Sequence, residues 1–356
     1  MMKRTVVASS ILLSVLVSPL ALAEHMAESK RTTEDLNATI EALKETYSTA
    51  ELLTALNEPV AESTGFHGNI GTNMELERVI RDDGVNEGKL KYTLAQGSFR
   101  HDNLPGWDFG FYSGREELFN GNTKHASYVR GVNSIQEIWA NKAFSFERGT
   151  IGLGGKLAME SIDERIQPGV KVFGSYRLTD SLSFNAYALY HVEYKRGAGT
   201  ELSVDDEGNV VSDKFKGEFP YWEIEPGVGY QLSDNSGVWL NLRLQQGKLS
   251  LENSANTRET ETEQIIKPGI WYSWGRASAS LWGEFGRLEK EDTNTGAHVW
   301  TEDYNKIGIS ANYSINKSWN MFGEVSYKDI KFSSGPNKDQ FDGYIPLFIA
   351  GINYNF

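Results

Sequence analysis

The sequence contains no cysteine among its 356 residues. Neither a disulfide framework nor a thiol nucleophile is therefore available, and a chain of this length can bury enough surface to fold without disulfides. The HExxH motif of zinc hydrolases and the usual zinc-ligand spacings are also absent. These absences exclude the commonest thiol and zinc chemistries.

Positive charge is scarce relative to negative charge. Lys and Arg together number 35 against 48 Asp and Glu, which gives a formal net charge of -13. Such an acidic balance argues against nucleic acid as a partner. The acidic run Asp205, Asp206 and Glu207 lacks the alternating oxygen ligands and the distal bidentate Glu of a calcium loop. We expect no metal site and no cofactor.

Long apolar runs are missing after residue 23, so we expect no membrane-spanning helix there, since such a helix needs about 20 apolar residues. Residues 1–23 read MMKRTVVASSILLSVLVSPLALA. Lys3 and Arg4 precede an apolar stretch, and the small residues Ala21 and Ala23 fit a cleavage site. The pattern predicts a secretory signal peptide that is removed on export.

Residues 24–64 have a different pattern from the rest of the chain. Leu36, Ile40 and Leu43 recur at helical spacing, which predicts an amphipathic helix over residues 33–57. We interpret residues 24–64 as a short periplasmic helical extension. Its role as a coiled coil, as a plug or as a solvated leader is left open by so short a pattern.

Period-two alternation begins at Phe66 and continues to the end of the chain, in a sequence that is 39% hydrophobic and 12% aromatic and has 35 glycines. Alternation of this kind suits strands with one face in lipid and the other in water. We predict fourteen strands, at about 66–77, 89–100, 107–117, 134–146, 150–160, 165–178, 181–194, 218–232, 237–250, 263–274, 276–289, 304–315, 319–331 and 344–356. The predicted fold is all-β, with residues 65–356 forming a 14-stranded antiparallel transmembrane β-barrel.

The predicted connections alternate between short turns and long polar segments. Short turns fall at places such as residues 103–106 and 179–180. The long polar connections are predicted at residues 195–217, 251–262, 290–303 and 332–343. Short turns on one side and long loops on the other are typical of outer-membrane barrels.

The alternation also predicts which side chains line the interior. Leu240, Leu242 and Leu244 alternate with polar residues such as Arg243, and we expect the leucines to face lipid. The opposite arrangement would place a basic side chain in lipid, which costs about 2–4 kcal/mol at the bilayer midplane. The charged residues between such apolar positions would face inward. The predicted pore-lining residues are Arg165, Lys171, Arg177, Glu223, Glu225, Arg243, Lys267, Glu284, Lys306, Glu324 and Lys328. A barrel of this size should leave a water-filled path, although both signs of charge could also form a salt-bridged plug.

The chain ends in GYIPLFIAGINYNF, a strand pattern with aromatics on one face. We expect this last strand to close the barrel against the first. Tyr354 and Phe356 are predicted to form an assembly signal that the barrel-insertion machinery reads.

A weak internal repeat places a Pro-Gly pair at similar positions in three predicted strands. The repeats are Gln167-Pro168-Gly169, Glu225-Pro226-Gly227 and Lys267-Pro268-Gly269. Because proline removes a ladder donor, these pairs are predicted to mark bulges or bends, unless they are only remnants of hairpin duplication.

With these motifs, residues 66–356 resemble the monomeric outer membrane porin G family. The resemblance is carried by the fourteen strands, by Leu178-Thr179-Asp180-Ser181-Leu182-Ser183-Phe184-Asn185, by Tyr304-Asn305-Lys306-Ile307-Gly308 and by the ending Gly351-Ile352-Asn353-Tyr354-Asn355-Phe356. The Pro-Gly strands more distantly resemble the oligogalacturonate-specific porins. The resemblance implies a monomer in the bacterial outer membrane, among lipid and lipopolysaccharide, that passes small hydrophilic solutes, with oligosaccharides as one class. Residues 24–64 depart from the family pattern. Some members of the family are gated by acid through a pair of histidines on adjacent strands. No such pair lies near His298, so pH gating is not expected.

Two other function classes would fit parts of the sequence. A plugged barrel that transports an apolar solute would use residues 24–64 as its plug. An outer-membrane hydrolase would need a placed histidine, for which His125 near Ser127, His191 before Glu193, and His298 are the candidates. We expect no enzymatic activity. The preferred solute and any gating by loops are left open by the sequence.

Overall fold

The computed structural model describes residues 65–84, 86–119, 132–161, 164–204, 210–252, 257–335, 338–339 and 341–356. The signal peptide and the helical extension predicted within residues 1–64 lie outside the described residues. In the ranges just given, no helix is long and apolar enough to cross a membrane.

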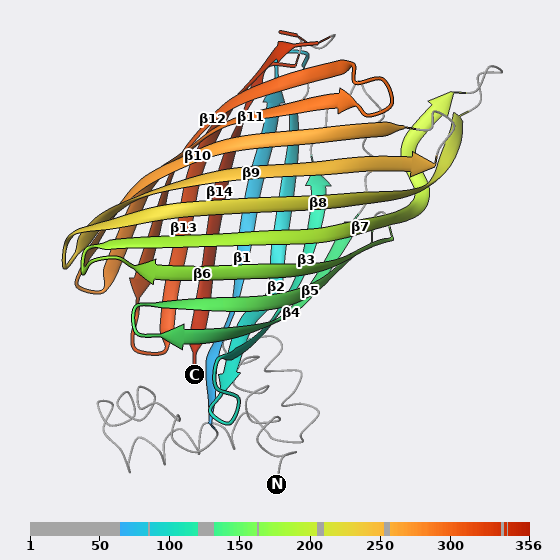
Figure 1. The fold of residues 1–356 in the computed structure, drawn as a ribbon. Helices are drawn as coiled ribbons and strands as arrows, with labels where there is room; N and C mark the ends of the chain where they lie inside the picture. The colour runs from blue at the N-terminus through green and yellow to red at the C-terminus, as the bar shows by residue number, and fades with distance from the viewer. Residues whose placement is uncertain are drawn as a thin grey trace, which may run out of the picture. The chain divides into compact units, whose positions relative to one another are not determined.

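Fourteen antiparallel strands form a closed barrel in which each strand pairs with its neighbours in the sequence and β1 pairs with β14 (Figure 1). The strands are β1 Phe66–Arg81, β2 Asn86–His101, β3 Trp107–Phe119, β4 Val132–Phe146, β5 Gly149–Glu160, β6 Arg165–Arg177, β7 Leu182–Val204, β8 Val210–Ser233, β9 Ser236–Glu252, β10 Arg258–Trp274, β11 Ala277–Asp292, β12 His298–Ser314, β13 Trp319–Ser334 and β14 Gly343–Asn355. Each predicted strand overlaps one observed strand, so the all-β fourteen-stranded barrel is confirmed.

The strand ends differ from the prediction on the side of the long connections. Most of the predicted connection 195–217 continues as β7 and β8, which run to Val204 and from Val210. The connections 82–85 and 161–164 on the same side are short. The prediction of regularly long loops was therefore wrong. Polar segments that leave the lipid can continue as strands, because the ladder still satisfies their backbone N–H and C=O groups.

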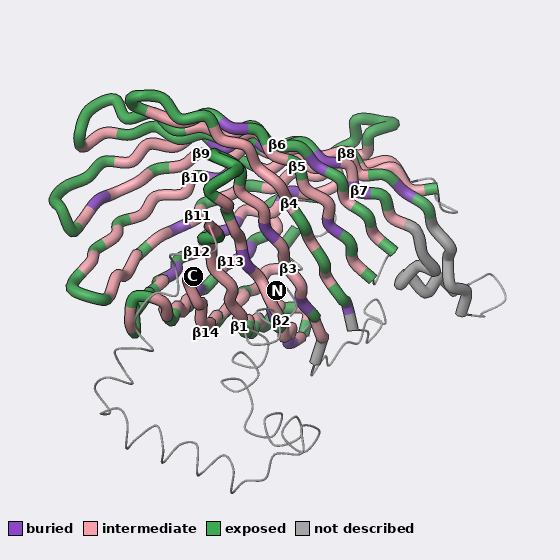
Figure 2. Tube along the Cα trace, turned by 90° about the horizontal axis from the view of Figure 1, so that it is seen from below, coloured by how far each residue is buried: buried purple, intermediate pink, exposed green. Residues whose placement is uncertain are grey.

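Outward and inward positions alternate as predicted. Leu240, Leu242 and Leu244 are 41%, 46% and 47% exposed, while Asn241 and Arg243 between them are only partly exposed. Figure 2 shows the same alternation of exposed and intermediate residues along many strands. Exposed aromatic residues flank this apolar face near the short turns, at Phe66, Trp107, Phe144, Phe146, Tyr176, Tyr230, Tyr272, Trp274 and Tyr313, and farther up the strands, at Tyr190, Tyr194, Trp222, Tyr327 and Tyr344. Two aromatic belts around an apolar band are typical of a barrel in a bilayer.

The barrel closes through the end of the chain, as predicted. The N–H of Gly68 donates to the carbonyl of Phe356, and the N–H of Phe356 donates to the carbonyl of Gly68, both at 3.0 Å. Farther along the seam, β1 and β14 pair from Asn69 with Asn355 to Arg81 with Gly343. The ring of Tyr354 stacks 6.5 Å from that of Phe356.

The three Pro-Gly pairs interrupt the sheet in the same way. The pairing of β6 with β7 skips Gln167 and Pro168, that of β8 with β9 skips Glu225 and Pro226, and that of β10 with β11 skips Lys267 and Pro268. The register is the same before and after each gap, so these sites are not bulges, and that part of the prediction was wrong. Each proline lacks the N–H that would have bonded the following strand.

Candidate pore interior

Ion pairs tie several predicted pore-lining residues to an adjacent strand or to the next strand but one, on the face opposite the apolar band. Lys267 Nζ lies 3.0 Å from Glu225 Oε2, and Lys328 Nζ lies 3.0 Å from Glu302 Oε1. Arg165 contacts Glu160 at 3.4 Å and Glu193 at 3.2 Å. Carboxylates and cations thus neutralise each other along the wall.

A chain of tyrosine–carboxylate hydrogen bonds continues this pattern from β7 to β12. The hydroxyls of Tyr187 and Tyr221 both donate to Glu223, the second at 2.6 Å. The hydroxyl of Tyr304 donates to Glu263 at 2.6 Å. Gln245 joins the two halves, because its Oε1 lies 2.5 Å from the Tyr221 hydroxyl oxygen and its amide N–H donates to Glu263.

The other predicted residues have different surroundings. Arg243 lies among the carboxylates of Glu223, Glu263 and Glu284. Glu284 pairs in register with Lys306, and Glu324 accepts a hydrogen bond of 3.0 Å from the hydroxyl of Ser310. Arg177 is exposed at the end of β6, beside a short turn.

Lys171 and Lys306 lie over aromatic rings. Lys171 Nζ is 4.8 Å from the ring centre of Tyr187 and 5.7 Å from that of Phe173. Lys306 Nζ is 5.0 Å from the ring centre of Trp282. A cation over an aromatic face is held by the ring quadrupole, which is a weaker restraint than a buried ion pair.

Inward aromatic rings lie against glycines of the facing strand, a feature that the sequence analysis missed. A Cβ on Gly110 would come within 2.1 Å of the Trp139 ring, and a Cβ on Gly269 within 2.0 Å of the Trp239 ring. The same arrangement joins Gly152 with Phe173, Gly286 with Tyr304, Gly308 with Trp282 and Gly351 with Phe322. In each pair the two residues are directly opposite in register. The glycines let the rings lie flat against the wall.

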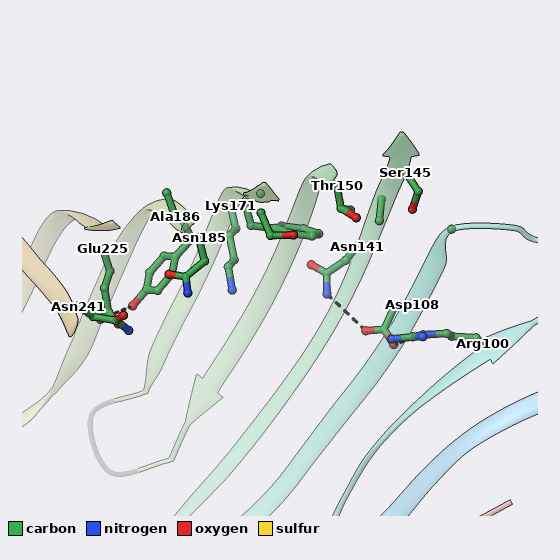
Figure 3. Close-up of a pocket in the computed structure, with 16 residues that line it drawn as sticks. Arg100, Asp108, Asn141, Ser145, Thr150, Lys171, Asn185, Ala186, Glu225 and Asn241 are labelled. Atoms are coloured by element: carbon green, nitrogen blue, oxygen red, sulfur yellow. Dashed lines mark hydrogen bonds and ion pairs between the residues drawn. The ribbon is translucent and has the colours of Figure 1, made fainter. Parts of the chain in front are cut away.

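A cavity of about 730 Å³ lies along the wall from β2 to β9, toward the short-turn end (Figure 3). Its polar lining includes Arg100, Asp108, Asn141, Ser145, Thr150, Lys171, Asn185, Glu225 and Asn241, and its aromatic lining is Phe173 and Tyr187. In Figure 3 the nitrogen ends of Lys171, Asn185 and Asn141 point in the same direction. The cavity therefore combines hydrogen-bonding groups, aromatic rings and charge.

The turn after β11 is ordered by its own hydrogen bonds. The backbone N–H and the hydroxyl of Thr295, and the backbone N–H of Asn294, donate to the Asp292 carboxylate. These bonds, those of Thr295 first, hold the pKa of Asp292 below its usual range because they stabilise the ionised carboxylate.

The histidine candidates for hydrolysis do not form a catalytic group in the described part of the chain. The ring of His191 stacks on Tyr221 with centroids 4.5 Å apart, and its Nε2 lies 3.3 Å from Gln167 Nε2. His298 Nε2 lies 2.7 Å from Ser334 Oγ. Neither ring is hydrogen-bonded to a serine and a carboxylate together, within the residues described. His125 and Ser127 lie outside those residues, as do Asp205, Asp206 and Glu207, and no cluster of metal-ligating side chains occurs in the described ranges.

Comparison with known proteins decides the family. Residues 48–356 match the OMPG-porin 1 family. The chain belongs to this family. This OMPG-type porin is accordingly an outer-membrane channel for small solutes, and the predicted resemblance to the porin G family is confirmed. No curated protein sequence matches the chain.

Several solved structures are similar to this porin at low identity. OmpT, an outer membrane protein of Vibrio cholerae, is 12% identical, with 84% of this chain and 100% of that chain covered and a TM-score of 0.45. The toluene transporter TodX of P. putida is 10% identical, with 83% and 90% covered and a TM-score of 0.46. The KdgM porin in complex with disordered oligogalacturonate is 12% identical, with 81% and 99% covered and a TM-score of 0.34.

Proposed function

We propose that the barrel is a water-filled channel for passive diffusion of small hydrophilic solutes, including short oligosaccharides. The observation that supports this proposal is the arrangement of the inner face. Its charged side chains are paired along the wall, as in Lys267 with Glu225, and its aromatic rings lie against facing glycines. Side chains held against the wall leave the centre of a wide barrel to water. The eleven residues predicted to line the pore, Arg165 to Lys328, are proposed to form this surface.

The remaining assignments belong to the same proposal. The barrel closes between its own β1 and β14, so one chain forms a complete barrel, and we propose that it acts as a monomer. Residues 1–23 would direct export and be cleaved, and residues 24–64 would form the periplasmic helical extension. Tyr354 and Phe356 would be recognised by the insertion machinery, and the aromatic belts would contact lipid and lipopolysaccharide. We assign no catalytic role to any residue.

A transporter of apolar solutes would need an apolar conduit. Ile265, Tyr304 and Ile330 do form a hydrophobic cluster, with Phe332 and Ile345 packed against it. The three central residues are only 2%, 5% and 9% exposed, so neighbouring side chains cover them and they offer little apolar surface to a solute. The charged and polar inner face favours hydrophilic solutes.

Single-channel recording tests the proposal. The purified full-length protein in a planar bilayer should give stable open-channel currents in KCl, and in liposomes it should admit small sugars but exclude large polysaccharides. Heat-unfolded protein is the control. A folded barrel with no measurable conductance would overturn the open-channel proposal and would favour a plugged transporter.

A further inference from the structure

Lys171 faces no charged residue across the sheet. Its register partners are Gly154 on β5 and Leu189 on β7, neither of which is charged. Lys91 also lies over an aromatic ring, with Nζ 5.6 Å from the centre of Tyr112, but it faces Glu75 in register. Lys171 has no ion pair within the described residues, so its charge is available to a solute.

The other charges around the cavity are already neutralised. Glu225 accepts from Lys267 and from Asn241 Nδ2 at 2.8 Å. Arg100 Nε donates to Asp108 at 3.3 Å. The cavity therefore presents one uncommitted positive charge, and this charge matches a ligand with a single negative charge.

The surroundings of Lys171 add groups that recognise hydroxyls. The amides of Asn141 and Asn185 and the hydroxyl of Thr150 line the same cavity, and the amide nitrogens point in the same direction as the Lys171 ammonium (Figure 3). The rings of Phe173 and Tyr187 flank the lysine. Ammonium, amide and aromatic groups together suit a compact carboxylate that also carries hydroxyls.

We propose that Lys171, with Asn141 and Asn185, forms a binding subsite for a small polyhydroxy carboxylate such as an aldonate or a uronate. The subsite deepens the proposed function, because it assumes an open channel and adds a preferred class of solute. Its location toward the short-turn end means that a solute would meet it at one end of the path. A charge-assisted hydrogen bond to Lys171 would hold the carboxylate while the amides contact hydroxyls.

Current block by glucuronate tests the subsite, with glucose as the neutral probe of the same ring size. The full-length channel is held in KCl at constant ionic strength, and block is measured as glucuronate is added. Wild-type protein should bind glucuronate more tightly than glucose, and Lys171→Gln should weaken glucuronate block by about tenfold or more, as expected for one lost charge-assisted hydrogen bond. Lys171→Arg should retain block, since it keeps the charge.

Lys91→Gln is the matched control, because it removes one inward charge from over an aromatic ring at a different place. It should retain glucuronate block. If Lys91→Gln and Lys171→Gln weaken glucuronate block equally, the effect comes from the overall electrostatic potential of the lumen, and the subsite proposal is overturned. Equal block of the wild-type channel by glucose and glucuronate would also overturn it. An unchanged affinity in a conducting Lys171→Gln channel would overturn it too. Failure of the porin function itself would be distinct, because wild-type protein would then carry no KCl current.

Discussion

Lys267 of β10 reaches across β9 and places its Nζ 3.1 and 3.0 Å from the two carboxylate oxygens of Glu225 on β8. Each of the two residues immediately precedes a Pro-Gly pair, where one side of the backbone ladder is interrupted. The ion pair therefore links β8 to β10, which are not neighbours. It does so at the height in the barrel where each of these strands lacks backbone hydrogen bonds to one neighbouring strand. We interpret it as a brace across the weakened part of the wall.

We expect Lys267→Met to destabilise the barrel, because it leaves the Glu225 carboxylate, which is 6% exposed, with only neutral donors. Adding Glu225→Gln should recover part of the loss, with a coupling free energy of about 1–3 kcal/mol. Urea unfolding of the four proteins of this double-mutant cycle in detergent or lipid measures the coupling. If the two effects are simply additive, the residues do not act as a pair.

Ion selectivity should depend on Lys171 more than on Arg243. Lys171→Glu reverses an uncommitted charge beside the cavity and should shift the reversal potential toward cations. At physiological salt charges are screened beyond about 8 Å, so the shift should grow as salt is lowered. Reversal potentials across a KCl gradient measure it.

Arg243→Gln is the informative comparison, because it removes a charge that lies among Glu223, Glu263 and Glu284. We expect it mainly to lower stability, since it removes a positive charge that offsets these carboxylates. A larger shift of the reversal potential in Arg243→Gln than in Lys171→Glu would show that Arg243, and not Lys171, carries the charge that permeating ions encounter.

The fold could be predicted from the sequence because its signal is local. Alternation at Leu240, Leu242 and Leu244 follows directly from the two faces of one strand and needs no partner. The brace between Lys267 and Glu225 could not be predicted, because it depends on the register of three strands. The glycine–aromatic pairs, such as Gly110 with Trp139, also require register. The strand ends were missed because polar composition indicates exposure to water and does not show where hydrogen bonding stops.

Gly110→Val should force Trp139 away from the wall. The new Cβ would come within 2.1 Å of the ring, so the ring must move or the strands must separate. We expect lower stability, and lower single-channel conductance where the displaced ring enters the lumen. Gly155→Ala is the control, because its Cβ meets no atom nearer than 3.9 Å. Normal stability and conductance in Gly110→Val would show that the contact does not restrict this position.

Deleting residues 28–58 should leave a folded, conducting barrel. The β1–β14 seam closes within the described part of the chain without using these residues. The heat-modifiable band on gels and the single-channel conductance check the two parts of this expectation. A failure to fold would show that the segment is structural, whereas a several-fold rise in conductance would identify it as a plug.

Removing Phe356 should block assembly of the barrel. The residue supplies both backbone hydrogen bonds with Gly68 and the ring that stacks on Tyr354, so its loss weakens the seam at its end. A charged replacement, Phe356→Asp, keeps the backbone bonds but places a carboxylate in the aromatic belt, and it should also reduce assembly. Phe356→Tyr retains both the ring and the backbone bonds and serves as the control. Outer-membrane fractions, assayed for the heat-modifiable form, should contain the control protein at normal levels and little of the other two. If the charged variant assembles normally while the deletion does not, the backbone bonds at Gly68 matter and the aromatic ring is not the recognised feature.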